Sequence, residues 1–250
     1  MSWIITGEQK NNWTPADIDT ALWLDAADGA TVFSDAGTTQ AVAGTSTVQQ
    51  WNDKSGNGRH VSQSNSAERP NYANAQIGGK VALDWGASLN SKSLTRDSMS
   101  YFPARYYGVA HYKGPNPFTA TSGFITHNNS GSGDLILTSN SGTNWAFIPL
   151  DGIFLNGSSS SSLVALPAIA TPFIFSTNFP VSSTRTNIYI GNDRLIADRG
   201  WLGCIGEIIA TPTALAQFER QKIEGYLAHK WGLTANLPSD HPYKTVIPVP

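Results

Sequence analysis

The sequence predicts an all-β protein, an antiparallel sandwich with one C-terminal α-helix. Three observations support this prediction. Short apolar segments separated by turn residues follow one another over about two hundred residues, as in sandwich proteins. No helical pattern is interleaved with them, which argues against alternating strands and helices. One long helical pattern, at 216–231, follows near the end of the chain.

The expected strands are short and bounded by turn residues. We expect them at 22–25, 81–85, 106–112, 135–138, 145–148, 153–156, 163–166, 172–176, 187–190 and 205–210. The run 157–162 (GSSSSS) is expected to form a flexible loop. The segment Phe173-Ile174-Phe175 is apolar at consecutive positions, so its strand is expected to be covered on both faces or to lie in a subunit contact.

The helical pattern at 216–231 rests on four residues that recur at steps of three and four and therefore share one face. These residues are Arg220, Ile223, Leu227 and Trp231. The helix is expected to begin between positions 212 and 217 and to end at Gly232, which is suited to a C-cap. Because Phe218 and Tyr226 lie off the centre of the stripe, the helix should contact protein on two sides, one of them the sheet.

Composition excludes several classes of partner. Charged residues make up only 14% of the chain and the formal net charge is -2, with no Lys/Arg cluster, so neither nucleic acid nor an anionic membrane is expected as a partner. Residues 1–12 lack the features of a signal peptide, so synthesis as a soluble cytoplasmic product is expected. The single cysteine, Cys204, rules out an internal disulfide framework and is expected to be a small buried strand residue.

A glycine-rich loop follows Trp51 in the sequence WNDKSGNGRH (51–60). Its glycines permit positive φ, and the short polar side chains of Asp53 and Asn57 can bond to neighbouring backbone groups, which favours a tight, ordered turn. The alternative is a Ca²⁺ site at the rim of the sandwich, with Asp53, Asn57 and loop carbonyls as oxygen ligands. Apart from this candidate calcium ion, no cofactor is expected.

The eight tryptophans raise the question of carbohydrate binding, because flat aromatic faces stack on the C–H surfaces of sugars. Four of them lie in or beside apolar segments and are expected to pack in the core or under the helix. These four are Trp23, Trp85, Trp201 and Trp231. Trp51, beside the glycine-rich loop, and Trp145, after the polar run 140–144, are the candidate exposed platforms, together with Asn57 as a candidate ligand-binding residue.

The sequence lacks the residue patterns of hydrolases. Retaining glycosidases need two carboxyl groups about 5–5.5 Å apart, and Glu207 has no acidic neighbour in the chain. We expect Glu207 to bond to Arg220 or to backbone groups, with Glu224 as another candidate partner of that arginine. Neither a Gly-x-Ser-x-Gly elbow, a phosphate loop nor a zinc cluster occurs. We therefore expect no enzymatic activity and no catalytic residues.

Three motifs together resemble a known family. They are LWLDA (22–26), the loop 51–60 with the RPNY segment (69–72) after it, and the long segment 206–243. With these motifs the chain resembles the laminin-G-like members of the concanavalin-A-like lectin/glucanase superfamily, especially those in bacteriophage virion proteins and bacterial surface proteins. The resemblance spans roughly residues 15–243. It implies a two-sheet jelly roll closed by a C-terminal helix.

The expected organisation is an N-terminal arm (1–14), the jelly roll (15–243) and a C-terminal tail (244–250). The arm is polar except for apolar residues that suit docking on a partner. These candidate partner-binding residues are Trp3, Ile4, Ile5 and Trp13. The alternative is that the arm folds back onto its own sandwich.

The resemblance implies a non-enzymatic bacteriophage virion accessory protein, a capsid decoration or tail component located in the virion, with other virion proteins as partners. A second hypothesis is a carbohydrate-binding adhesin module that recognises bacterial surface glycans through rim loops. A third is an accessory domain once attached to a carbohydrate-processing enzyme. Because jelly rolls of virions are often arranged symmetrically, we expect a homo-oligomer by analogy.

Overall fold

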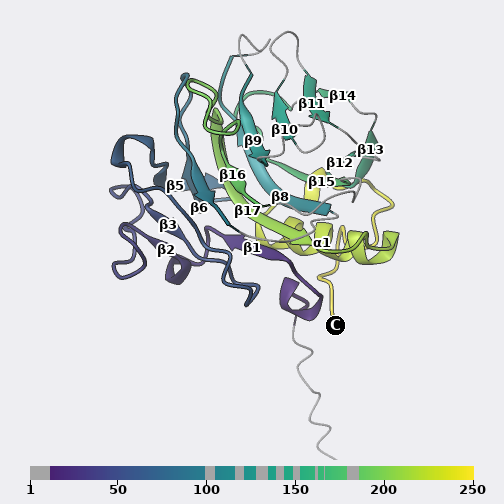
Figure 1. The fold of residues 1–250 in the computed structure, drawn as a ribbon. Coiled ribbons are helices and arrows are strands. Elements are labelled where there is room, and N and C mark those ends of the chain that lie inside the picture. Colours follow the sequence, from purple (N-terminus) through teal and green to yellow (C-terminus); the bar gives the residue numbers. More distant parts are fainter. Residues whose placement is uncertain are drawn as a thin grey trace, which may run out of the picture.

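The computed structural model describes residues 12–98, 105–115, 121–127, 135–138, 144–148, 153–160, 163–165, 167–178 and 186–250. Two antiparallel β-sheets pack against each other, and one α-helix covers the outer face of one sheet (Figure 1). The predicted two-sheet β-sandwich with a single C-terminal helix is therefore confirmed for these residues. The same part of the chain contains no helix with the length and hydropathy of a membrane span.

Sheet A is the one that carries the helix. Its order is β13 (Ser158–Ser160), β12 (Ile153–Leu155), β15 (Phe173–Asn178), β8 (Arg105–Tyr112), β17 (Gly203–Thr211), β6 (Lys80–Asp84) and β5 (Asn71–Ile77). β1 (Leu22–Asp25) also pairs with β17. One edge of β17 pairs with β8, while its other edge pairs first with β6 and then with β1. This change of partner occurs at Gly206, where the register with β8 also shifts.

Sheet B packs on the opposite face of sheet A. Its order is β14 (Leu163–Ala165), β11 (Asn144–Ile148), β10 (Leu135–Thr138), β9 (Gly123–Thr126), β16 (Ile188–Ile190), β7 (Leu94–Arg96), β4 (Val61–Ser62), β3 (Gln50–Trp51) and β2 (Val32–Phe33). Short 3₁₀ turns lie at Pro15–Asp17, Gly29–Thr31, Ser66–Glu68 and Thr234–Asn236. The ten predicted strands all occur, with shifts of one or two residues at some ends, whereas several two- to seven-residue strands were not expected.

The serine-rich run was predicted to be a flexible loop, and this prediction is wrong. Ser158–Ser160 forms β13, which pairs with β12 in a hairpin. The turn between these strands is Asn156-Gly157, with φ of 51° and 83°. Two consecutive positive φ angles are what a tight two-residue hairpin turn requires, and Asn-Gly is the dipeptide that adopts them most readily.

Aromatic side chains fill the core between the two sheets. Phe124 of sheet B lies 5.0 Å from the ring of Phe175 and 4.7 Å from that of Trp201, both edge-on. Phe173 and Phe175 point into this core, while Ile174 between them belongs to the cluster under the helix. The apolar segment is thus covered on both faces within one chain, as one of the two sequence alternatives proposed.

The helix α1 (Gln217–Lys230) follows the prediction closely, with Ala216 and Trp231 as its caps. All four residues of the predicted stripe are buried, and α1 contacts β8 and β15. On another side, Gly225 lies against Tyr243 and Pro248 of the C-terminal segment. The helix therefore touches protein on two sides, as expected, with sheet A on one and the end of the chain on the other.

Candidate functional site

The glycine-rich loop 51–60 is a tight turn in which the carboxylate of Asp53 has no oxygen left for a cation. Each carboxylate oxygen accepts two hydrogen bonds at 2.8–3.0 Å. The donors are the backbone N–H groups of Trp23, Ser55 and Arg59 and the Ser55 hydroxyl. Asn57 turns its amide nitrogen to the carbonyl of Thr20 at 2.9 Å.

The predicted calcium ligands Asp53 and Asn57 therefore do not form a cation site. Hydrogen-bond donors surround the Asp53 carboxylate, whereas a calcium ion needs several oxygen ligands that point toward it. No group of three or more His, Cys, Asp or Glu side chains in the described residues is arranged to hold a metal ion. The contacts of this loop fit the turn interpretation, in which Asp53 fixes the loop to β1.

The predicted tryptophan platform at Trp51 is wrong. Its side chain is 0% exposed in the core between the sheets, so no sugar reaches its ring. Trp145 lies in β11, and its side chain is outside the described residues. The four tryptophans expected to be buried are at most 7% exposed. These are Trp23, Trp85, Trp201 and Trp231.

The N-terminal segment folds back onto the sandwich where the structure describes it. Trp13 is 3% exposed and packs edge-on against Tyr226 of α1, with ring centroids 5.9 Å apart. Its backbone N–H donates to the carbonyl of Pro248 at 2.9 Å. Trp13 is therefore not a free anchor for a partner. The other predicted anchors, Trp3, Ile4 and Ile5, lie outside the described residues.

A buried hydrogen-bond network ties α1 to sheet A, and its centre is Glu207 on β17. Glu207 is 0% exposed. Its Oε1 accepts hydrogen bonds from Trp23 Nε1 at 2.7 Å and from the Tyr226 hydroxyl at 2.9 Å. Its Oε2 accepts from Trp231 Nε1 at 2.7 Å and from Lys230 Nζ at 2.8 Å. Each oxygen of this buried carboxylate thus accepts two hydrogen bonds, so the hydrogen-bonding capacity of the group is satisfied.

Asp25 on β1 brings a second buried carboxylate next to Glu207. The two residues are direct partners in the β1–β17 register, and Asp25 is 3% exposed. Lys230 Nζ lies 2.7 Å from Asp25 Oδ2, and Lys54 Nζ lies 2.9 Å from the same atom. Burial raises the pKa of Glu207, and the charge of Asp25 raises it further against the opposing effect of Lys230. Burial, followed by the charge of Glu207, also raises the pKa of the Tyr226 hydroxyl.

A second buried ion pair fixes the C-terminal segment to α1. Arg220 Nη1 lies 2.5 Å from Glu224 Oε1, and the guanidinium lies 3.7 Å from the centroid of the Phe154 ring. The other oxygen of Glu224 lies 3.3 Å from Nε2 of His241. The predicted pairing of Arg220 with Glu224 is therefore confirmed. The alternative pairing of Arg220 with Glu207 is wrong, because Glu207 bonds to the network described above.

A third buried polar group is His111 on β8. It is 2% exposed, and neither ring nitrogen has a hydrogen-bond partner among the described residues. Cys204, which is fully buried as predicted, is the cross-strand partner of His111 on one side and of Asp84 on the other. Lys113 Nζ lies 2.9 Å from Asp84 Oδ2. Burial lowers the pKa of His111 to about 4, and the charge of Lys113 lowers it further.

This geometry predicts loss of stability in mild acid. The pKa of His111 in the folded state, about 4, lies below its ordinary value of 6.5, so the unfolded chain binds more protons between these two values. The stability contributed by neutral His111 is present above pH 6.5 and decreases as the pH falls toward 4, by at most about 3 kcal/mol. Urea unfolding at a series of pH values measures this loss.

The His111→Leu variant is the control for this prediction. Leucine cannot titrate, so the free energy of unfolding of this variant should change less between pH 6.5 and 4 than that of the parent chain. Equal pH dependence in both proteins would show that other groups cause the acid effect.

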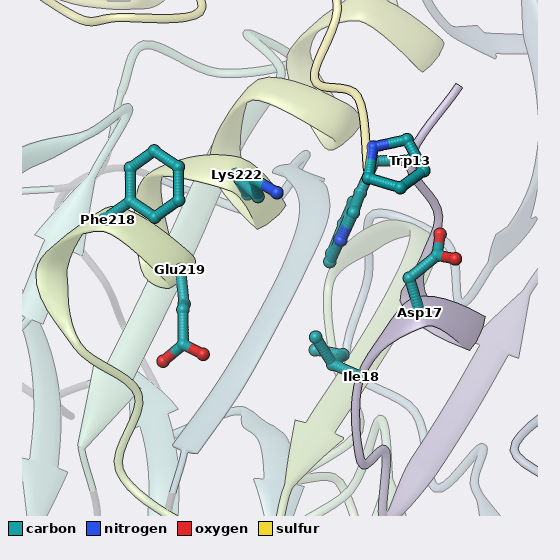
Figure 2. A pocket seen from close by; sticks show the side chains of 7 residues that line it. Trp13, Asp17, Ile18, Phe218, Glu219 and Lys222 are labelled. Carbon is teal, nitrogen blue, oxygen red and sulfur yellow. The ribbon is translucent and has the colours of Figure 1, made fainter. Parts of the chain in front are cut away.

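An open cleft of about 360 Å³ lies between the first turn of α1 and the segment around the 3₁₀ turn Pro15–Asp17. Its lining residues are Trp13, Asp17, Ile18, Phe218, Glu219, Lys222 and Pro250. Figure 2 shows Phe218, Glu219 and Lys222 projecting from the helix on one side, with Trp13, Asp17 and Ile18 on the other. We refer to this feature as the helix cleft.

One apolar residue of the helix cleft, Phe218, is open to solvent. Its side chain is 59% exposed, whereas Trp13 on the other wall is 3% exposed. Lys222 Nζ lies 5.2 Å from the centroid of the Phe218 ring, a cation–π contact that places the lysine beside the aromatic face. The cleft therefore exposes the aromatic ring of Phe218 and the positively charged amine of Lys222 side by side.

The two carboxylates of the helix cleft are held in place by helix caps. Asp17 Oδ2 accepts the backbone N–H of Thr14 at 2.7 Å, and Glu219 Oε2 accepts that of Ala216 at 3.1 Å. Both contacts are the side-chain half of a capping box, in which an acid at the third helical position bonds back to the N-cap. Asp17 Oδ1 and Glu219 Oε1 take no part in these contacts. The cleft thus combines an aromatic face with fixed hydrogen-bond acceptors.

Comparison with known proteins adds structural neighbours but no family. No protein-family model and no curated protein matches the sequence. A mutant GH54 α-L-arabinofuranosidase soaked with 4-nitrophenyl α-L-arabinofuranoside matches with 15% identity and a TM-score of 0.48. A GH54 α-L-arabinofuranosidase soaked with a cyclic sulfate inhibitor matches with 14% identity and a TM-score of 0.47. An arabinofuranosidase complexed with arabinofuranosyl-α-1,2-xylobiose matches with 13% identity and a TM-score of 0.47.

In each case 85% of this chain is aligned, and it spans 64% of the length of the matched chain. Two predictions are corrected by these findings: that the chain is a bacteriophage virion accessory protein, and that it has no enzymatic activity. The finding that overturns both is that the matched structures are glycoside hydrolases. The activity of the matched enzymes is not assigned to this chain, because structural similarity at such low sequence identity concerns the fold alone. The expected partners, homo-oligomer and virion location are tested by none of these observations.

Most of the residues that form the helix cleft were not predicted as site residues. Trp13 was assigned to an arm, and Phe218 was noted only as lying off the helical stripe. Two signals were present in the sequence. Thr14 and Asp17 have capping-box spacing, which marks a helical turn there, and an aromatic residue off the buried stripe of a helix is a candidate for exposure. Neither signal indicates that the two elements meet.

Proposed function

We propose that this chain is a carbohydrate-binding β-sandwich and that the helix cleft is its binding site. The observation that carries the proposal is an exposed aromatic ring, Phe218, in a cleft that is also lined by two carboxylates that helix caps hold in fixed positions. Sugars need this combination, because their C–H faces pack on aromatic rings while their hydroxyls donate to fixed acceptors.

The size and openness of the cleft support the proposal. Its volume of about 360 Å³ lies at the lower end of the range for ligand sites, roughly 300–1,000 Å³. Lys222 adds a donor beside the ring, so hydroxyl groups of a ligand would meet both acceptors and a donor. The acceptors need no ordering on binding, because the caps already position them, and this preorganisation favours affinity.

We expect Phe218→Ala to weaken oligosaccharide binding by roughly three- to tenfold, since an aromatic contact is worth about 0.5–1.5 kcal/mol. Glu219→Gln should weaken binding as well, because the amide offers a poorer acceptor while it can still cap the helix. Isothermal titration calorimetry with a panel of neutral xylo-, cello- and arabinose-substituted xylo-oligosaccharides measures both effects.

Val42→Ala is the matched control, because Val42 is 61% exposed and does not line the cleft. Its affinity should equal that of the parent chain. Binding that survives both cleft substitutions would place the sugar site elsewhere on the sandwich, and absence of binding to every oligosaccharide in the panel would argue against the proposal.

A further inference from the structure

Lys230, Asp25 and Glu207 form a compact set that the helix cleft does not use. Lys230 Nζ lies 2.7 Å from Asp25 Oδ2 and 2.8 Å from Glu207 Oε2. The side chains of the two acids are 4% and 0% exposed, whereas that of the lysine is 20% exposed. An amine therefore touches one buried carboxyl group while it donates a hydrogen bond to a second.

The backbone holds the three groups in place from three elements. Asp25 on β1 and Glu207 on β17 face each other directly in the strand register. Lys230 is the last residue of α1, and Trp231 after it donates to Glu207 at 2.7 Å. Reacting groups held together in this way behave as if present at very high concentration, which removes much of the entropic barrier to a reaction between them.

We propose that Lys230 and Asp25 become joined by an isopeptide bond between Nζ and Cγ, with Glu207 transferring the proton. The amine attacks the carboxyl carbon, the new C–N bond forms, and the C–O bond to one carboxyl oxygen breaks. Glu207 accepts a proton from the nitrogen and delivers one to the departing oxygen. One water molecule leaves, and nothing is oxidised or reduced.

The contacts around Glu207 hold its carboxyl group beside the two groups to be joined. Trp23, Tyr226 and Trp231 each donate a hydrogen bond to Glu207, which fixes its position next to Lys230. Burial raises the pKa of Glu207, which suits a group that carries a proton. Lys54 also touches Asp25, but its second partner is the more exposed Asp28 rather than Glu207.

The product would tie the beginning of the sandwich to its closing helix. The bond links residue 25 to residue 230 and thus closes most of the chain into a covalent ring that passes through sheet A. Such a cross-link restricts the unfolded chain in the way a long-loop disulfide does, but reducing agents do not break it.

The test is the intact mass of the purified full chain, measured under denaturing conditions. We expect the mass to be lower than that of the sequence by one water molecule, and we expect a branched peptide joining Asp25 to Lys230 after proteolysis. A chain with the full sequence mass overturns the proposal.

Three variants separate this reaction from other losses of water. Lys230→Arg keeps the charge but should show its full sequence mass, and Glu207→Gln should do the same because it cannot carry the proton. Asp25→Asn should lose ammonia instead of water and reach the same final mass as the cross-linked parent chain. Loss of water that persists in Lys230→Arg would assign it to another site and overturn the proposal.

Discussion

Replacing Glu224 with alanine is expected to lower the free energy of unfolding by about 3–5 kcal/mol, because it leaves the buried guanidinium of Arg220 without its anionic partner. Glu224 is 0% exposed and Arg220 is 5% exposed, so water does not replace the lost carboxylate. The same substitution removes the acceptor of His241, which loosens the C-terminal segment from α1. Urea unfolding followed by tryptophan fluorescence gives the free energy directly.

The control for this prediction removes both charges. The double variant Arg220→Met with Glu224→Leu fills the same space without a buried charge, and such replacements often cost little. We expect it to be more stable than Glu224→Ala alone. If the single variant loses less than about 1 kcal/mol, the site admits enough water to solvate the arginine, and the pair contributes no more than a surface ion pair does.

Trp231→Ala is expected to cost about 3–5 kcal/mol, the usual range for removing a large buried aromatic side chain. Trp231 is 0% exposed, and its ring lies directly on Gly206 of β17. A Cβ atom at Gly206 would lie 2.8 Å from that ring, so the glycine is what allows the helix to approach so closely. The substitution also removes one of the donors to Glu207, and thermal unfolding measures the total effect.

Phe218→Ala provides the comparison on the same helix. Because Phe218 is 59% exposed, its removal should change the free energy of unfolding by less than about 0.5 kcal/mol. The contrast tests whether the Phe218 side of α1 contributes to stability in addition to the sides that contact sheet A and the C-terminal segment. Equal losses in the two variants would show that the outer face of α1 is also packed.

The fold was predictable because its signals are local. The strand at 22–25 matches β1 at both ends, and the predicted helix at 216–231 differs from α1 only by its two caps. Periodicity of apolar residues within one element decides such assignments. The Asn156-Gly157 dipeptide is an equally local signal of a hairpin turn. The serine run after it was interpreted as a loop, although it forms a short edge strand.

The buried networks could not be predicted, because their members are distant in the sequence. Glu207 has no acidic neighbour in the chain, yet strand pairing brings Asp25 to its side. The environment of Trp51 was misjudged for a related reason. Polar residues follow it in the sequence, and they form a turn at the surface while the ring itself points into the core. Neighbours in sequence do not show which way a strand residue faces.

The hydrogen bond between Trp13 and Pro248 has a practical consequence for experiments. It places the end of the chain at the helix cleft, where Pro250 forms part of the wall. An affinity tag or a fluorescent protein fused after Pro250 would emerge at the mouth of the opening and would compete with the proposed oligosaccharide ligand for the same space. Immobilisation through surface lysines away from α1 would leave that opening clear.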